Sequence, residues 1–200
     1  VTRDPLLTRA LKDIEVSLAR GFGHTHRKAP QYPVRIVFAL ELLVTDPAAV
    51  PYHRVYAWYR LVRTWASLRF DDAVHIKPED VRLQDGSLEF RLGRTKTTGP
   101  GKRVEAVTAH VGGGAYLSER DWLGTGFVIF RDLGAGIERD YLLPMPDALL
   151  QGFRSTPVRY ADELSLSRAL LGALRLPERI DGGWAPGLVQ LLAPEAANFW

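Results

Sequence analysis

Apolar residues recur at helical spacing through the first part of the chain. Nearly every position from 34 to 44 is apolar and Asp46-Pro47 closes the stretch, so we expect a buried helix there. A second helix is predicted over residues 52–68, because large apolar side chains fall along one stripe of it. That stripe consists of Val55, Trp58, Val62 and Trp65. We interpret it as core rather than as a binding surface.

Two further helices are predicted near the ends of the chain. Asp4 can cap a helix with Pro5 at its first position, and leucines at helical spacing continue it until Gly21. Residues 21–33 are rich in glycine, proline and basic side chains, which is typical of a linker. Residues 161–174 again show a helical pattern.

Beyond Pro78 the period changes from helical to alternating. The alternation starts at Val81, passes through the hairpin signal Asp85-Gly86 and continues to Leu92. A second turn is expected at residues 97–101, TTGPG, and a third strand at 104–108. The pattern therefore predicts a three-stranded antiparallel meander.

The region after the meander gives weaker signals. Ser118 or Asp121 can open a helical or turn segment, and the apolar run FVIF at 127–130 resembles a short strand. A turn is expected around Pro144 and Pro146. Taken together, the elements predict an α+β fold that is mainly helical and contains the three-stranded antiparallel meander.

Composition narrows the class of protein. The 200 residues are 46% hydrophobic and include no cysteine, which excludes disulfides and thiolate metal sites. No apolar run reaches the roughly 18 residues of a membrane span, so no membrane partner is expected. Residues 1–103 hold 18 Lys+Arg against 11 Asp+Glu, and this basic excess favours a polyanionic partner.

The stretch GRTKTTGPGKR, residues 93–103, concentrates positive charge without any acid. Its cations are Arg94, Lys96, Lys102 and Arg103. A phosphate-binding P-loop would need glycine at position 96 and serine or threonine at position 103, so that motif is absent. The remaining interpretations are a solvated turn or a loop that meets an anion.

A second distinctive stretch is SLRFDDAVHIKPEDV, residues 67–81. Arg69 follows an apolar helix, and Asp72 stands three residues later. A guanidinium held by a carboxylate can present its planar fork to two oxygens of a phosphate. An ion pair between Arg69 and Asp72 that serves only stability explains the same pattern equally well.

The order of these features resembles the catalytic domain of the tyrosine recombinases, the phage-integrase-like family. The resemblance covers roughly residues 28–110: a helix, Leu-Arg-x-x-acid, Pro-x-Asp-Val, a meander, and a lysine at its second hairpin. It implies that Arg69 grips the scissile phosphate, that Asp72 supports Arg69, and that Lys96 protonates the departing 5′ oxygen. Double-stranded DNA is the implied partner, contacted by Arg94, Lys102 and Arg103, and no metal or other cofactor is implied. Residues 1–27 would then end a helical DNA-clamping domain, and residues 28–200 would form the N-terminal part of the catalytic domain.

The chain departs from this family in its last third. A His-x-x-Arg motif and a tyrosine nucleophile are expected near the C-terminal end, yet no histidine follows His110. None of Tyr116, Tyr141 and Tyr160 stands in a context typical of the nucleophile. We therefore expect a C-terminally incomplete catalytic domain that binds DNA but cannot cleave it alone.

The resemblance implies DNA recombination or integration inside the cell, in a nucleus or a bacterial cytoplasm, with self-association on DNA in the complete protein. The sequence also leaves two other interpretations of the chain open. The chain could instead be a catalytically inactive DNA-binding or structural module of the same fold. A third alternative is an unrelated α+β protein in which residues 93–103 are only a solvated turn.

Overall fold

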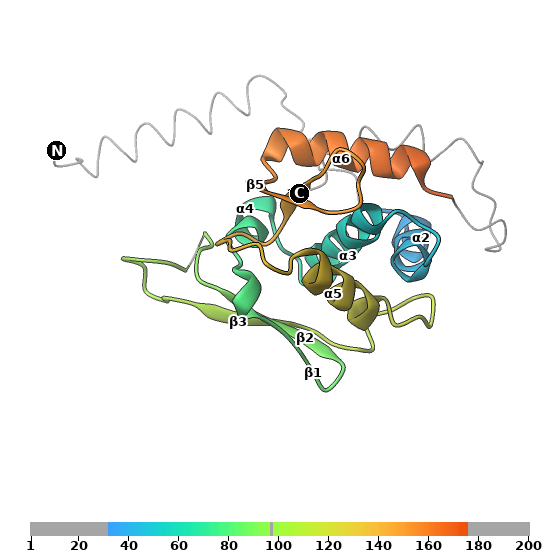
Figure 1. Ribbon diagram of the computed structural model, residues 1–200. Helices are drawn as coiled ribbons and strands as arrows, with labels where there is room; N and C mark the ends of the chain where they lie inside the picture. Colours follow the sequence, from blue (N-terminus) through green and yellow to red (C-terminus); the bar gives the residue numbers. More distant parts are fainter. Residues whose placement is uncertain (1–31, 97, 176–200) are drawn as a thin grey trace, which may run out of the picture.

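The computed structural model describes residues 32–96 and 98–175. The helices are α2 (Val34–Thr45), α3 (Pro51–Trp65), α4 (Phe70–Val74), α5 (Trp122–Leu133) and α6 (Tyr160–Ala173), with a 3-10 turn η1 (Pro78–Asp80). The strands are β1 (Val81–Gln84), β2 (Ser87–Leu92), β3 (Val107–Val111), β4 (Pro144–Pro146) and β5 (Phe153–Pro157). This confirms the predicted α+β fold with its antiparallel meander (Figure 1). The predicted helix over residues 4–21 and most of the linker lie outside the described residues.

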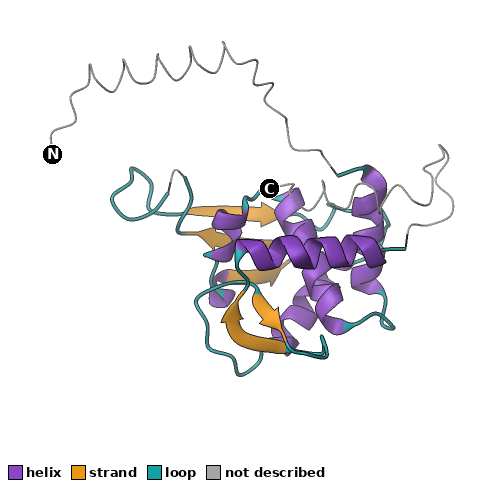
Figure 2. Cartoon of the chain, turned by 90° about the horizontal axis from the view of Figure 1, so that it is seen from above, coloured by secondary structure: helices purple, strands orange, loops and turns teal. Residues whose placement is uncertain are grey.

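Helix α3 lies at the centre of the molecule, between α2, α5 and α6 (Figures 1 and 2). Side chains on nearly all sides of it are buried, because other elements cover it all round. The Tyr52 hydroxyl donates to the Pro144 carbonyl at 3.0 Å, and the Tyr56 hydroxyl donates to the Glu163 carbonyl at 2.9 Å. Of the predicted stripe, Val55, Trp58 and Val62 are core residues, whereas Trp65 is 38% exposed.

Helix α3 ends earlier than predicted. Ser67 adopts a left-handed backbone with φ 54°, and the Leu68 amide donates back to the Arg63 carbonyl at 2.9 Å. This is the hydrogen bond of a Schellman motif, which usually uses glycine at the left-handed position. The sequence has serine there, so it carried no signal for the early end.

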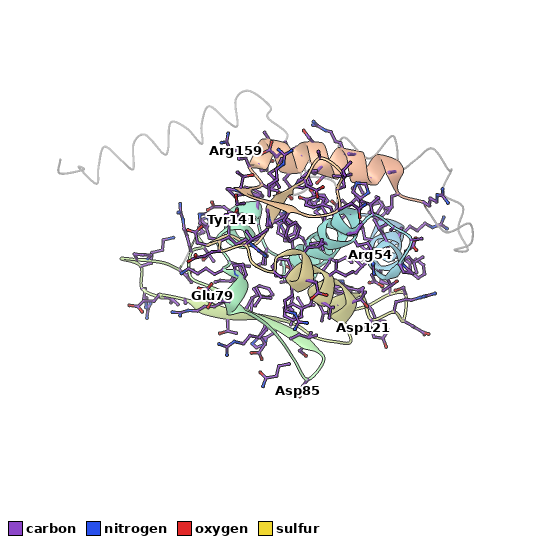
Figure 3. The ribbon with its side chains drawn as sticks, in the orientation of Figure 1. Arg54, Glu79, Asp85, Asp121, Tyr141 and Arg159 are labelled. Atoms are coloured by element: carbon purple, nitrogen blue, oxygen red, sulfur yellow. The ribbon has the colours of Figure 1, made fainter. Side chains whose placement is uncertain are left out.

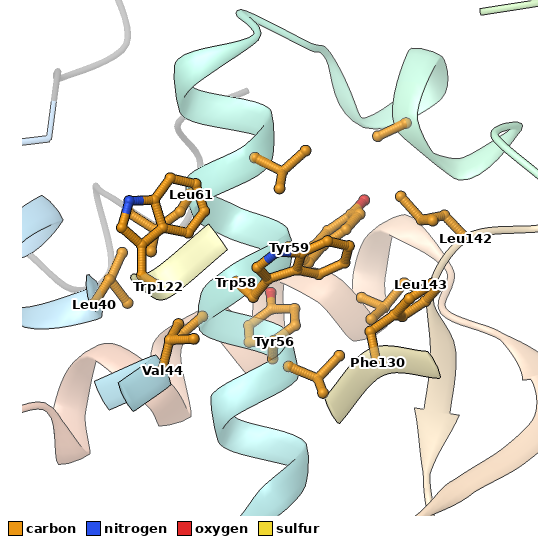
Figure 4. Close-up of a cluster of buried hydrophobic side chains, with 14 of the residues drawn as sticks. Leu40, Val44, Tyr56, Trp58, Tyr59, Leu61, Trp122, Phe130, Leu142 and Leu143 are labelled. Atoms are coloured by element: carbon orange, nitrogen blue, oxygen red, sulfur yellow. The ribbon is translucent and has the colours of Figure 1, made fainter. Parts of the chain in front are cut away.

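The predicted strand at residues 127–130 is wrong, because these residues belong to α5. The Asp121 side chain accepts from the Gly124 amide at 2.8 Å and so caps the helix. One face of α5 packs on α3, where the rings of Phe130 and Trp58 stack with centroids 5.0 Å apart (Figure 4). The four-residue apolar run was too short to distinguish a strand from a buried helix.

The meander has the predicted order β1-β2-β3, with antiparallel pairing throughout. Asp85 and Gly86 both have positive φ, as the tight turn between β1 and β2 requires. The third strand begins at Val107 rather than at residue 104, because Val104 instead bridges Thr98 within the β2–β3 connection. The turn predicted around Pro144 and Pro146 is also wrong, since both prolines belong to β4, which pairs with β5.

Candidate nucleic-acid interface

Arg69 stands at the N-cap of α4, directly after the turn that ends α3. Its backbone is extended, with φ −74° and ψ 164°, and its side chain is exposed. Its backbone amide donates to Oδ2 of Asp72 at 3.1 Å. The structure thus gives Asp72 a different contact from the expected one, because its carboxylate caps the helix instead of holding the guanidinium. Among the described residues, the Arg69 guanidinium forms no ion pair.

The β2–β3 connection, residues 93–106, carries the four predicted cations. Its base is ordered by Thr98, which is 2% exposed and whose hydroxyl lies 2.8 Å from that of Thr95. The Thr98 hydroxyl also donates to the Leu92 carbonyl at 3.3 Å. A buried threonine at the base makes this segment a structured loop rather than a purely solvated turn.

The four cations of the connection differ in their surroundings. Arg94, Lys96 and Arg103 are exposed. Lys102 is also exposed, but its ammonium donates to the Thr95 carbonyl and so ties the two sides of the connection together. We therefore expect Lys102 to shape the loop and to contact an anion less freely than Arg94 or Arg103 does.

The connection and α4 are found toward the same end of the molecule (Figure 1). They are also consecutive in the fold, because α4 leads through η1 into β1 and the meander. The predicted roles of Arg69, Lys96 and Asp72 in one catalytic site stay predictions.

A buried charge cluster lies beneath this end of the molecule, and the sequence did not reveal it. Oε1 of Glu163 on α6 accepts from Arg60, at 2.6 Å, and from Arg63, both on α3. All three residues are at most 3% exposed. Burial raises the pKa of neighbouring Tyr59 to about 12, so this phenol stays neutral beside the ion pairs. The available signal was the position of Arg60 and Arg63, three residues apart among apolar and aromatic residues in the second half of the helix.

The cluster also supports α4. The Arg63 guanidinium lies over the Tyr59 ring at 5.3 Å and over the Phe70 ring at 5.9 Å from the centroid. Phe70 directly follows Arg69, so the start of α4 is packed on a fixed buried cation. The exposed arginine therefore projects from a well-supported backbone.

The three tyrosines after the meander differ in exposure. Tyr116 is 45% exposed and Tyr160 is 48% exposed. The Tyr141 hydroxyl is buried and has no hydrogen-bond partner among the described residues. Burial also raises the pKa of the Tyr141 hydroxyl, which makes it a poorer nucleophile near neutral pH.

Residues 32–96 and 98–175 contain no group of three or more His, Cys, Asp or Glu side chains that could hold a metal ion. The same residues include no helix of the length and apolar character that a membrane crossing requires.

No protein-family model matches the chain, and no curated protein sequence matches it either. Among solved structures, it is similar to the XerH site-specific recombinase bound to its difH substrate in a pre-cleavage complex. The two are 14% identical with a TM-score of 0.45, and the match covers 86% of this chain and 43% of that one. The chain thus spans less than half the length of that recombinase chain, and a likeness this distant does not define a family.

Proposed function

We propose that the chain is a DNA-binding segment of a tyrosine-recombinase-like protein. The observation that carries the proposal is the exposed Arg69 at the N-cap of α4, immediately upstream of a meander whose second connection is rich in exposed cations. Helix α4 and this connection lie toward the same end of the molecule (Figure 1). Exposed guanidinium and ammonium groups can form charge-assisted hydrogen bonds with the phosphates of a nucleic acid backbone.

Lys96 and Arg69 have distinct roles in this proposal. The guanidinium of Arg69 holds two nonbridging oxygens of a phosphate and stabilises the charge that develops there. In the complete protein a tyrosine hydroxyl attacks the phosphorus and loses its proton, while the bond from phosphorus to the 5′ oxygen breaks. The Lys96 ammonium gives its proton to that departing oxygen.

Binding is tested with the 200-residue chain and a fluorescent DNA duplex, by anisotropy between about 50 and 200 mM salt. We expect the affinity of the chain to fall steeply with salt, because cations contact several phosphates. Arg94→Ala and Arg103→Ala should each weaken binding and reduce the log-log salt slope by about 0.9 per lost phosphate contact.

The control is Arg131→Ala on α5, which removes one exposed charge away from the β2–β3 connection. Its salt slope should equal that of the unaltered chain. A chain that does not bind duplex DNA, or equal slopes for all four proteins, would overturn the proposed interface.

A further inference from the structure

Arg63 contacts the residues on both sides of Arg69. Its backbone carbonyl accepts from the Leu68 amide at 2.9 Å, in the turn that ends α3. Its guanidinium lies over the ring of Phe70, at 5.9 Å from the centroid, at the start of α4. Leu68 and Phe70 are the chain neighbours of Arg69, so one residue of α3 holds the chain directly before it and directly after it.

Arg63 is itself fixed in the interior. It is 1% exposed, and its guanidinium forms an ion pair with Glu163 of α6. The ring of Phe70 has a second support on that helix, because it meets the ring of Tyr160 edge to face with centroids 5.5 Å apart. The start of α6, where Arg159 is labelled, lies on the side of the molecule that carries α4 (Figure 3). The Phe70 ring is therefore held by side chains of two helices, α3 and α6.

The side chain of Arg69 has no comparable support of its own. It is exposed, and among the described residues its guanidinium forms no ion pair. Its amide donates to Oδ2 of Asp72 at 3.1 Å, a contact that fixes the main chain and not the guanidinium. Because the rotamers open to a side chain depend on its backbone angles, the main chain at residues 68–70 limits where this guanidinium can reach.

We propose that Arg63 is a positioning residue for Arg69: through Leu68 and Phe70 it aims the exposed guanidinium at a phosphate of duplex DNA. The inference rests on the proposed function, in which Arg69 holds that phosphate. A planar fork contacts two oxygens of a phosphate only when its plane is correctly placed, so a change in backbone direction weakens the contact. Arg63 is buried and does not itself reach the DNA.

The test is a double-mutant cycle on duplex affinity, measured by anisotropy over the same salt range. Phe70→Leu removes the ring that Arg63 holds and keeps an apolar side chain, so it breaks this connection without removing a charge. We expect Arg69→Ala to weaken binding by about tenfold or more, as the loss of a hydrogen bond to a charged group does. Phe70→Leu should weaken binding by a smaller factor, and the double variant should bind no more weakly than Arg69→Ala. Losses that multiply in the double variant would overturn the proposal.

Two further variants separate the ring contact from the fold. Phe70→Tyr keeps the ring and should retain the affinity of the unaltered chain. Tyr160→Ala removes the second support of the ring at a residue that is 48% exposed, and its effect on affinity should likewise vanish in the Arg69→Ala background. If Phe70→Leu does not fold, the cycle with Tyr160→Ala decides by the same criterion.

Phe153→Leu is the matched control. The Phe153 ring also lies beneath an arginine, Arg139 at 5.6 Å from the centroid, and also meets a tyrosine edge to face, Tyr52 at 5.9 Å. It belongs to β5 and does not adjoin Arg69. Phe153→Leu should lower the melting temperature and leave duplex affinity unchanged. An equal loss of affinity in Phe153→Leu and Phe70→Leu would mean that destabilisation alone explains the result, and the positioning role would be wrong.

The unaltered chain and Arg69→Ala decide the proposed function separately. If the unaltered chain does not bind duplex DNA, or if Arg69→Ala binds as tightly as the unaltered chain does, the proposed function fails and the positioning role fails with it. If Arg69→Ala weakens binding and Phe70→Leu folds but does not weaken it, only the role of Arg63 fails.

Discussion

Glu163 is the residue that holds the buried charges of Arg60 and Arg63. Its Oε1 atom accepts from two arginines, while no described partner contacts its Oε2 atom. Arg60 also donates to the Tyr32 hydroxyl and lies over the Tyr32 ring at 5.2 Å. Removing this single carboxylate charge would take away the ion pairs that Glu163 forms with both buried arginines.

We expect Glu163→Gln to lower the free energy of unfolding by about 3–5 kcal/mol, the cost of breaking a buried ion pair from one side. Chemical denaturation followed by circular dichroism measures this change. Glu138→Gln is the control, because Glu138 is exposed and its change should stay within about 0.5 kcal/mol. Equal effects of the two substitutions would show that the carboxylate charge of Glu163 does not stabilise the fold.

The sequence by itself indicates where a charged residue stands in the chain better than it indicates which contacts that residue makes. Arg69 was singled out because of its neighbours in sequence, and the structure shows it exposed at a helix start. The contact of Asp72 could not be foreseen, since a carboxylate three residues after an N-cap can reach either the backbone amide or the side chain. Arg60 and Arg63 were not identified as core residues, because their partner is about a hundred positions away.

At the scale of elements, α5 depends on its close approach to α3. A Cβ added at Gly126 would lie 2.7 Å from the Cβ of Trp58 and closer still to the indole ring. Trp58 cannot move easily, because its indole N–H donates to the Leu123 carbonyl at 3.1 Å and its ring stacks on Phe130. Glycine at position 126 therefore lets the two helices pack.

Gly126→Ala should destabilise the protein by about 1–3 kcal/mol or more through overpacking. Gly172→Ala on α6 is the matched control, because no atom lies within 4 Å of its added Cβ. It should be neutral or stabilise by up to about 1 kcal/mol, since alanine favours helix. Melting temperatures and tryptophan fluorescence measure both variants, and similar melting temperatures would contradict the packing argument.

Elements with a long periodic pattern were predicted well, and short ones were not. Helix α2 was expected over residues 34–44 and runs to Thr45, and the hairpin at Asp85-Gly86 is confirmed. The four apolar residues at 127–130 were misread because so short a run does not distinguish a strand from a helix, and only Phe130 of the four is buried. The end of α3 depends on one serine in a left-handed conformation, which the sequence pattern does not encode.

At the scale of the whole molecule, the residues of the proposed site can hold a phosphate, but this chain supplies no identified nucleophile to attack it. No His-x-x-Arg motif follows Arg69, and the Tyr141 hydroxyl is buried. We expect the 200-residue chain to form no covalent adduct with a nicked duplex that traps a phosphotyrosyl bond, as judged by denaturing gel electrophoresis. An adduct that depends on one of the chain's tyrosines would contradict this expectation and identify the nucleophile.

By itself the sequence determined the α+β class, the meander and the concentration of cations in residues 93–103, because periodicity, turn residues and charge are local properties. Only the tertiary structure decided which distant groups meet. It joined Glu163 to Arg60 and Arg63, and it brought the rings of Phe70 and Tyr160 into contact. The physical reason is that packing between α3, α4 and α6 depends on the shapes of side chains far apart in sequence.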